Sequence, residues 1–421
     1  MTSTSPNVTA TAEWAKRNQP DWINEIVLSD LEQDPNPIFD RLRREAPLAY
    51  IPGIGTWVAS TRPICAQIAT DTANFGGGMA PTIERTFDGK PILGMDGDDH
   101  RDLRNMVDPQ LAPQAVDSYV DDLVRPIARK YVAEFEDRGH ADLVEEYFEP
   151  VSVRTLGDLL GFNEVDSDTL RRWFKFLSCG IANGALDKNG DFLHPEGFDD
   201  ADEAKREIRA IVDPMMARLK DEPDDTGISH WMHDGMPEGQ IHPPDRIYPT
   251  LFTVILGGMQ EPGHACSAAV YGLLQHPDQF DEVLEKPHLI PRAINEGLRW
   301  IAPIWNTASR IAHRDTEIGD VVVRAGDVVM LSYGSANRDI GTWETAPNDF
   351  DLHRPVVPHL AFGAGAHVCA GAYQAQHTSR IALEELFDSI PNLELDDSAG
   401  AVDIWGWDIS GLTKLNVRWE V

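Results

Sequence analysis

One short segment constrains this chain more than any other: the loop from Phe362 to Gly371, with the sequence FGAGAHVCAG, which follows a proline-rich approach. Its three glycines permit a sharply turned backbone, and a helical pattern begins directly after it, near Ala372. A thiolate placed just before a helix, among backbone N–H groups, is a stabilised anion and a good axial ligand for iron. We therefore predict that Cys369 ligates iron. A glycine-rich turn with a buried free cysteine is the alternative.

A second motif lies upstream of this cysteine loop. Glu296 and Arg299 are three residues apart on a predicted helix, which places the carboxylate and the guanidinium on one face. Such pairs are common on protein surfaces, where they contribute little to stability. Arg354, shortly before the cysteine loop, would convert the pair into a buried triad.

Composition restricts the partners of the chain. Its 421 residues are 42% hydrophobic, and Lys plus Arg (36) against Asp plus Glu (69) give a net charge of -33. This charge would repel a nucleic-acid backbone and an anionic bilayer alike. The most apolar run, Thr250 to Met259, is shorter than the roughly 20 residues that a spanning helix requires. We expect a cytoplasmic protein with no nucleic-acid or membrane partner.

Periodicity predicts a mainly α protein with a minor β part and without internal repeats or a domain linker. Residues 1–21 form a polar tail without the features of a signal peptide, and residues 22–421 form one domain. Strands are predicted at Val321–Val323 and Val328–Ser332, on either side of a glycine-containing turn. Helical patterns extend over Val116–Phe135, with a bend at Pro126, and over Leu170–Leu177, Glu203–Leu219, Ile247–Leu274, Ile290–Trp300 and Tyr373–Phe387.

Taken in order, Glu296 and Arg299, then Arg354, then the Phe-Gly-x-Gly-x-His-x-Cys-x-Gly loop resemble the cytochrome P450 family. The resemblance covers the chain from about Trp22 onward. It implies the triangular, mainly helical P450 fold, with haem b (iron protoporphyrin IX) held by Cys369, and Phe362 beside the cofactor. It also implies that His100, Arg104, Arg310 and His367 offer cations to the haem propionates.

A structural zinc site is a competing interpretation, because His264, Cys266, His367 and Cys369 supply two histidines and two cysteines. Their His-x-Cys spacing is unusual for zinc. The site would also leave Phe362, the glycines and the Glu296 and Arg299 pair unexplained.

The segment from Leu256 to His264 departs from the usual P450 pattern. Gln260 and Glu261 stand where most members have an acid followed by threonine. Oxygen activation consumes two protons, which Glu261 could deliver through ordered water, and Pro262 would open the helix locally to admit that water. An exposed glutamate beside a helix kink is the alternative.

This segment, together with Glu296–Ile304, Leu331–Asn337 and Ala401–Trp407, resembles bacterial P450s that O-demethylate guaiacol-type methoxyphenols. The resemblance implies release of a catechol and formaldehyde, with dioxygen as co-substrate and electrons from a separate NADH-dependent reductase that carries flavin and an iron-sulfur cluster. Arg101 and Arg380 are candidates for its docking. Hydroxylation of another small aromatic compound and a non-catalytic haem-thiolate sensor or carrier remain open.

The same resemblance implies a mostly apolar substrate cage. Ile181 and Ile409 stand where phenylalanine is expected, so the cage should be longer or wider and should favour alkylguaiacols. The cage positions fall on Phe87, Leu93, Ile181, Thr253, Leu256, Gly257, Ile304 and Ile409.

Overall fold

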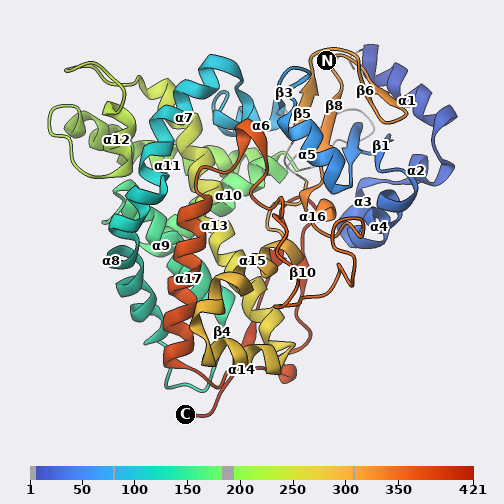
Figure 1. Ribbon diagram of the computed structural model, residues 1–421. Helices are drawn as coiled ribbons and strands as arrows, with labels where there is room; N and C mark the ends of the chain where they lie inside the picture. Colours follow the sequence, from blue (N-terminus) through green and yellow to red (C-terminus); the bar gives the residue numbers. More distant parts are fainter. Residues whose placement is uncertain (1–5, 79–80, 183–193, 307–308) are drawn as a thin grey trace. The chain divides into compact units, whose positions relative to one another are not determined.

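The computed structural model describes residues 6–78, 81–182, 194–306 and 309–421 (Figure 1). Its secondary structure is mainly helical with small sheets, which confirms the predicted fold class. The chain divides into two compact units, each built from several chain segments. Unit 1 is Met1–Gly78, Asn295–Cys369 and Ile404–Gly411, and unit 2 is Met79–Ile294, Ala370–Asp403 and Leu412–Val421.

Unit 1 is organised around a five-stranded sheet with the strand order β1-β2-β8-β5-β3. Strands β2 and β8 are parallel and the other neighbours are antiparallel. The strands of unit 1 are β1 (Leu48–Ile51), β2 (Thr56–Ala59), β3 (Phe75–Gly78), β5 (Ser309–Ala312), β6 (Thr316–Ile318), β7 (Val321–Val323), β8 (Val328–Leu331) and β10 (Ile404–Trp405), with β11 (Gly411–Leu412) at its end.

Short helices pack around this sheet. They are α1 (Pro6–Asn18), α2 (Asp21–Glu25), α3 (Leu28–Gln33), α4 (Pro35–Glu45), α5 (Arg62–Thr70), α16 (Tyr333–Ala336), the 3₁₀ turn η4 (Gly365–His367) and the Asn295–Trp300 part of α15 (Ile290–Trp300). Apolar side chains from α5, β2, β5, β8 and α16 form one buried cluster, which includes Trp57, Cys65, Ala312 and Tyr333. Because strand side chains alternate, one face of β5 and β8 contributes to this core.

Unit 2 is a helical body built on α13 (Pro244–Leu274). Buried side chains occur all round this helix, as expected for a helix in the middle of a core. Its other helices are α6 (Pro81–Thr86), α7 (Gly97–Leu111), α8 (Pro113–Val132), α9 (Glu149–Leu160), α10 (Ser167–Ala182), α11 (Glu196–Leu219), α12 (Gly227–His233), α14 (Pro277–Glu285) and α17 (Ala372–Ser389), with single turns η1 (Ile92–Gly94), η2 (Val144–Phe148), η3 (Pro287–Leu289) and η5 (Asp397–Ala399).

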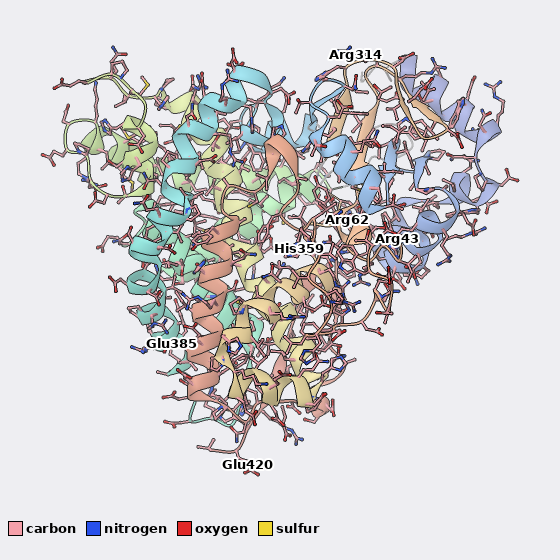
Figure 2. All side chains as sticks on the ribbon, in the orientation of Figure 1. Arg43, Arg62, Arg314, His359, Glu385 and Glu420 are labelled. Carbon is pink, nitrogen blue, oxygen red and sulfur yellow. The ribbon has the colours of Figure 1, made fainter. Side chains whose placement is uncertain are left out.

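A small sheet completes unit 2, with β12 (Asn416–Arg418) between β4 (His140–Asp142) and β9 (Glu394–Leu395). Helices α8 and α17 run side by side (Figure 1). Glu385 of α17, labelled in Figure 2, accepts hydrogen bonds from Arg125 and Arg129 of α8 at 2.5 and 2.7 Å. Ion pairs therefore join the two helices.

The predicted helices are found, and α15 has the predicted bounds. The predicted strands β7 and β8 are also found; β7 pairs with β6, and β8 lies between β2 and β5. One expectation needs correction. The polar N-terminal tail is not loose over Pro6–Asn18, which is helical, since Ala15 is buried in the core of unit 1 and Thr11 donates to Asp327. The boundary at residue 21 stays a prediction.

Candidate functional site

The cysteine loop has the sharply turned backbone that its glycines predict. Gly363 and Gly365 both have φ +72°, and a Cβ on Gly365 would lie 2.3 Å from the carbonyl oxygen of Ala69. Only glycine fits there without a backbone shift. The amide of Cys369 donates to the carbonyl of Phe362 at 2.9 Å, and α17 begins at Ala372, as predicted.

The cysteines of the chain differ in their surroundings. Cys65 and Cys266 are buried, and burial raises the pKa of both thiols, that of Cys266 to about 12. Burial also raises the pKa of Cys179. These three are therefore thiols at neutral pH. The side chain of Cys369 is exposed at the turn before α17, which is where an iron ligand has to be presented.

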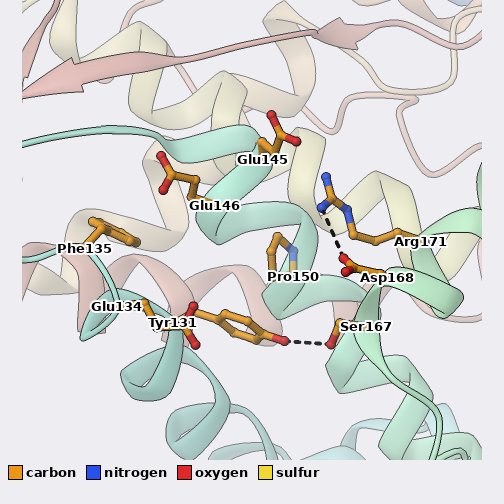
Figure 3. Close-up of a pocket in the computed structure, with 9 residues that line it drawn as sticks. All are labelled: Tyr131, Glu134, Phe135, Glu145, Glu146, Pro150, Ser167, Asp168 and Arg171. Carbon is orange, nitrogen blue, oxygen red and sulfur yellow. Dashed lines mark hydrogen bonds and ion pairs between the residues drawn. The ribbon is translucent and has the colours of Figure 1, made fainter.

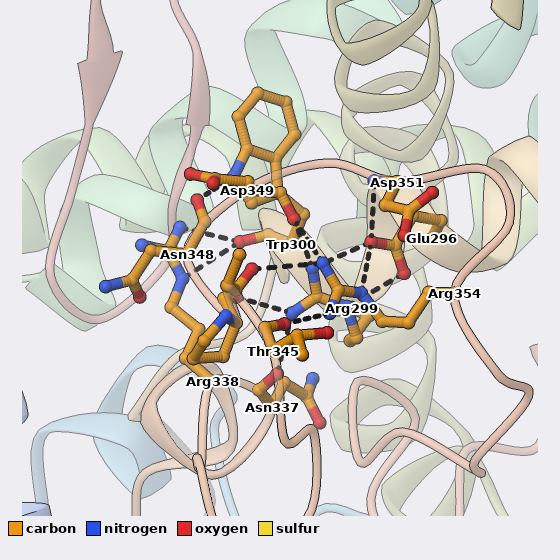
Figure 4. A network of polar contacts seen from close by, with 12 residues as sticks. Glu296, Arg299, Trp300, Asn337, Arg338, Thr345, Asn348, Asp349, Asp351 and Arg354 are labelled. Carbon is orange, nitrogen blue, oxygen red and sulfur yellow. Dashed lines mark hydrogen bonds and ion pairs between the residues drawn. The ribbon is translucent and has the colours of Figure 1, made fainter.

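Glu296, Arg299 and Arg354 come together as a buried triad in unit 1 (Figure 4). Arg299 binds the carboxylate side-on, with Nε donating to Oε2 and Nη2 to Oε1, both at 2.8 Å. Arg354 Nε donates to Oε1 at 2.9 Å, and the amide of Asp351 donates to the same oxygen at 3.0 Å. Every carboxylate oxygen of Glu296 is thus hydrogen-bonded.

Backbone carbonyls satisfy the remaining donors of the two arginines. Arg299 donates to the carbonyls of Asn337, Pro347 and Asp349 at 2.7–3.0 Å. Arg354 donates to those of Thr345, Ala346 and Asp349 at 2.6–3.0 Å (Figure 4). The triad therefore fixes the course of residues 345–351, in addition to forming ion pairs.

The predicted haem contacts are distributed over both units. Unit 1 contains Phe362, His367 and Arg310, and unit 2 contains His100 and Arg104 on α7. His100 is buried, and Arg104 pairs with Asp108 one turn further along α7, at 2.8 Å. The roles of these residues toward haem stay predictions.

Arg310 provides a test of whether unit 1 suits a haem propionate. It is 6% exposed, and its one hydrogen bond within the described residues goes from Nη1 to the carbonyl of Ser309 at 2.9 Å. No carboxylate of the described chain pairs with it. A buried guanidinium without a counter-ion is unfavourable, so this site fits a ligand carboxylate.

Glu261 lies on α13, which continues unbroken through Pro262. The alternative of an exposed glutamate is contradicted by the burial of the Glu261 carboxylate. Both carboxylate oxygens are buried, and neither has a hydrogen-bond partner among the described residues. Burial raises the pKa of Glu261 to about 8. Its Oε2 lies 3.9 Å from the position that a Cβ on Gly257 would take, one turn earlier.

The predicted substrate residues also fall into two groups. In unit 1, Ile304 and Ile409 face each other in an isolated antiparallel bridge. The other six belong to unit 2, where Phe87 and Leu256 are buried in the core and Leu93 is 46% exposed. Ile181 packs against the same core, and the hydroxyl of Thr253 donates to the carbonyl of Pro249.

A surface pocket in unit 2 contains none of the predicted site residues (Figure 3). Its cation, Arg171, already pairs with Glu149 at 2.7 Å, and the hydroxyls of Tyr131 and Ser167 bond to each other. This leaves no unpaired positive charge to attract an anion. The lining residues are Tyr131, Glu134, Phe135, Glu145, Glu146, Pro150, Ser167, Asp168 and Arg171.

Two residues at the site were not predicted. Asn337 links the triad to the approach of the cysteine loop, because its carbonyl accepts from Arg299 while its Oδ1 accepts from the amide of Leu360 at 2.7 Å. Tyr333 lies under the cysteine loop, with its ring edge and hydroxyl 3.6 Å from where a Cβ of Gly363 would be. Neither residue belongs to a short motif, so spacing gave no signal for them.

Among the described residues, no group of three or more His, Cys, Asp or Glu side chains is placed to hold a metal ion, which gives the zinc interpretation no support. No helix in the described ranges has the length and apolarity needed to span a bilayer.

The fold and the cysteine loop are those expected of a haem-thiolate protein. Proteins of this class are similar to the chain in sequence. Residues 244–389 match the family model "Cytochrome P450". A putative cytochrome P450 of Bacillus subtilis, YjiB, is 26% identical over 86% of this chain and 88% of its own length. The 6-deoxyerythronolide B hydroxylase of Saccharopolyspora erythraea is 28% identical over 76% and 75%.

A solved structure shows the same fold. The P450 enzyme CYP109B1 of Bacillus subtilis superimposes with a TM-score of 0.79 over 92% of this chain and all of its own, at 24% identity. Over most of its length the chain is therefore similar to members of the cytochrome P450 superfamily, which bind haem b and act as monooxygenases. The reaction requires dioxygen and a redox partner.

Proposed function

We propose that this P450 removes the methyl group of methoxyphenols such as guaiacol and alkylguaiacols. In the balanced reaction, one oxygen atom of dioxygen is inserted into a C–H bond of the methoxy group. The other oxygen atom is reduced to water, which consumes two electrons and two protons. The resulting hemiacetal breaks its C–O bond to give a catechol and formaldehyde. The bound haem supplies the oxygen-activating chemistry. Cys369 would ligate its iron, and the cationic residues described above would hold its propionates.

The main support for this proposal is that the carboxyl group of Glu261 lies beside Gly257 on α13. Gly257 is a predicted substrate residue, and the absence of its side chain leaves room for the Glu261 carboxyl, which burial keeps largely protonated at pH 7. A neutral acid holding its proton at this position can supply one to the reaction and regain it from water. The resemblance of this segment to guaiacol-type demethylases supports the choice of substrate.

The test is a product analysis with guaiacol, NADH and a reductase that carries flavin and an iron-sulfur cluster. We expect equal amounts of catechol and formaldehyde. Cys369→Ala should lose the red-shifted Soret band of the reduced carbon monoxide complex and all product, whereas Cys65→Ala and Cys179→Ala should keep both. A ring-hydroxylated product that retains its methoxy group would indicate another aromatic hydroxylase. Substrate binding without turnover would indicate a sensor or carrier.

Ile181 and Ile409 set the expected size preference. A branched aliphatic side chain in place of phenylalanine leaves volume that an alkyl chain on the substrate ring can fill. Each added methylene should strengthen binding by about 0.8 kcal/mol. Dissociation constants for guaiacol and its 4-methyl, 4-ethyl and 4-propyl derivatives test this. Constants that do not fall along the series, or an Ile181→Phe variant with the same series, would contradict the larger cage.

Docking of the reductase is expected to depend only weakly on Arg101 and Arg380. Arg101 pairs with Asp98, and Arg380 pairs with Glu384 at 2.6 Å and with Asp121 at 3.4 Å, so carboxylates already offset both charges. Ionic strength and charge reversal at both positions should each change the electron-transfer rate by a small factor. An unchanged rate in both experiments would exclude electrostatic docking at these residues.

A further inference from the structure

The core of unit 1 contains the hydroxyl group of Tyr333. Tyr333 opens α16, two residues after the end of β8, and its side chain is 3% exposed. Its phenolic oxygen has no hydrogen-bond partner among the described residues. A buried hydroxyl without a hydrogen-bond partner is unfavourable, whereas phenylalanine would fill the same space without that cost. The hydroxyl therefore has room for a hydrogen-bond acceptor that the described residues do not supply.

The positive charge of Arg310 acts on this hydroxyl. Arg310 pairs in register with Val329 of β8 and shares a sheet face with Ala312, two residues along β5. Ala312, Val329 and Tyr333 belong to one buried cluster, so Arg310 and Tyr333 lie on the same side of the sheet. Burial raises the pKa of Tyr333 to about 12, and the positive charge of Arg310 opposes this rise. Tyr333 therefore remains a proton donor.

The cysteine loop also lies close to the Tyr333 hydroxyl. Tyr333 Oη lies 3.6 Å from the position of a Cβ on Gly363, whose φ of +72° belongs to the turn that presents Cys369. Leu360 and Ala364 pack against the same cluster as Tyr333. The Tyr333 hydroxyl thus lies against the loop that carries the predicted iron ligand, and it is under the influence of a buried cation that pairs with no described carboxylate.

We propose that the hydroxyl of Tyr333 donates a hydrogen bond to the haem propionate that Arg310 pairs with. A carboxylate at Arg310 would satisfy the buried cation and the buried phenol together, and hydrogen bonds to ionised acceptors are about twice as strong as neutral ones. Tyr333 is then a cofactor-binding residue of unit 1. This inference depends on haem binding and is independent of the proposed demethylation.

The test measures how fast haem leaves the intact protein, using transfer to excess apomyoglobin. Tyr333→Phe keeps the ring and removes only the hydroxyl. We expect about tenfold faster haem loss, which corresponds to about 1.4 kcal/mol. Tyr50→Phe is the matched control, because Tyr50 is equally buried in the same cluster but lies on β1 against Trp57. It should change the rate less than twofold.

Haem dimethyl ester separates a propionate contact from a packing role. Its esterified propionates carry no negative charge and accept weaker hydrogen bonds. Loaded with this haem, wild type and Tyr333→Phe should release it at rates within twofold of each other. Equal acceleration by Tyr333→Phe with natural haem and with the diester would overturn the proposal, because it would show that the hydroxyl only supports the fold. Unchanged loss of natural haem would also overturn it.

A measurement on wild type covers the case in which Tyr333→Phe does not fold. Ultraviolet resonance Raman spectra of the protein loaded with natural haem and with the diester should differ in the tyrosine ring modes, because one phenol exchanges a carboxylate acceptor for an ester. Superimposable tyrosine bands would overturn the proposal.

Discussion

Two buried glutamates, one in each unit, have opposite surroundings. Glu296 of unit 1 accepts hydrogen bonds from two arginines and a backbone amide, while Glu261 of unit 2 accepts none from the described residues. A carboxylate with compensating charges can stay ionised when buried, whereas one without partners favours its neutral form. The hydrogen bonds of the Glu296 triad fix the backbone of residues 345–351, whereas Glu261 keeps a proton on its carboxyl group. Satisfied and unsatisfied buried polar groups therefore mark structural and chemical roles in the same chain.

The largest effect is expected at Glu296. Glu296→Ala would leave Arg299 and Arg354 buried without their shared anion, and breaking a buried ion pair from one side costs about 3–5 kcal/mol. Glu296→Gln keeps the shape and one acceptor oxygen, so its cost should be smaller. Urea denaturation of the haem-loaded variants measures both free energies of unfolding.

The control for this prediction is an exposed ion pair of unit 1. Glu45 pairs with Arg41 one turn earlier on α4 at 3.0 Å, with both side chains more than 40% exposed. Glu45→Ala should change the free energy of unfolding only slightly, because exposed ion pairs contribute little to stability. If Glu296→Ala were as mild as Glu45→Ala, the triad would not stabilise residues 345–351 and the contrast between the two glutamates would disappear.

The second prediction concerns the pH dependence that Glu261 confers. Its folded-state pKa of about 8 exceeds the ordinary value of 4.5, so between these values the folded protein retains a proton that the unfolded chain has lost. This contribution to stability is complete below pH 4.5 and is lost as the pH rises toward 8, by about 1.4 kcal/mol per pH unit. Glu261→Gln has no such proton.

Denaturation of wild type and Glu261→Gln between pH 5 and pH 8 tests this. The stability of Glu261→Gln relative to wild type should increase steadily across the range. Asp408, whose pKa burial raises to about 7, is present in both proteins and cancels from the difference. In turnover, Glu261→Gln should divert electrons to peroxide. A difference in stability that is independent of pH would mean that Glu261 is already ionised in the folded protein.

The sequence predicted the parts of the site that local spacing controls. The glycines and Cys369 are close together in the chain, and the three-residue separation of Glu296 and Arg299 on a helix fixes their common face. The carbonyls that accept from Arg299 lie 38, 48 and 50 residues further along the chain. The hydroxyl of Tyr333 belongs to a different helix from Glu296 and Arg299. Such partners depend on how loops fold back, and no short pattern encodes them.

The smallest predicted effect distinguishes two adjacent glycines on α13. A Cβ on Gly257 would contact only Glu261 Oε2, at 3.9 Å, an ordinary van der Waals distance. Alanine is a better helix former than glycine by about 1 kcal/mol, so Gly257→Ala should stabilise the protein by about 0.5–1 kcal/mol. It should also screen the Glu261 carboxyl from water and thereby increase peroxide formation at unchanged haem content.

Gly258→Ala is the matched control, because the gain in helix propensity is the same but the surroundings differ. A Cβ on Gly258 would lie 2.7 Å from Leu156 Cδ2 of α9, so the two helices or the leucine side chain must shift. Overpacking of this kind costs about 1–3 kcal/mol, which outweighs the propensity gain. Thermal denaturation of both variants should therefore move in opposite directions. If Gly257→Ala stabilised the protein yet left peroxide formation at the wild-type level, the space beside Gly257 would not be the route by which Glu261 exchanges its proton with water.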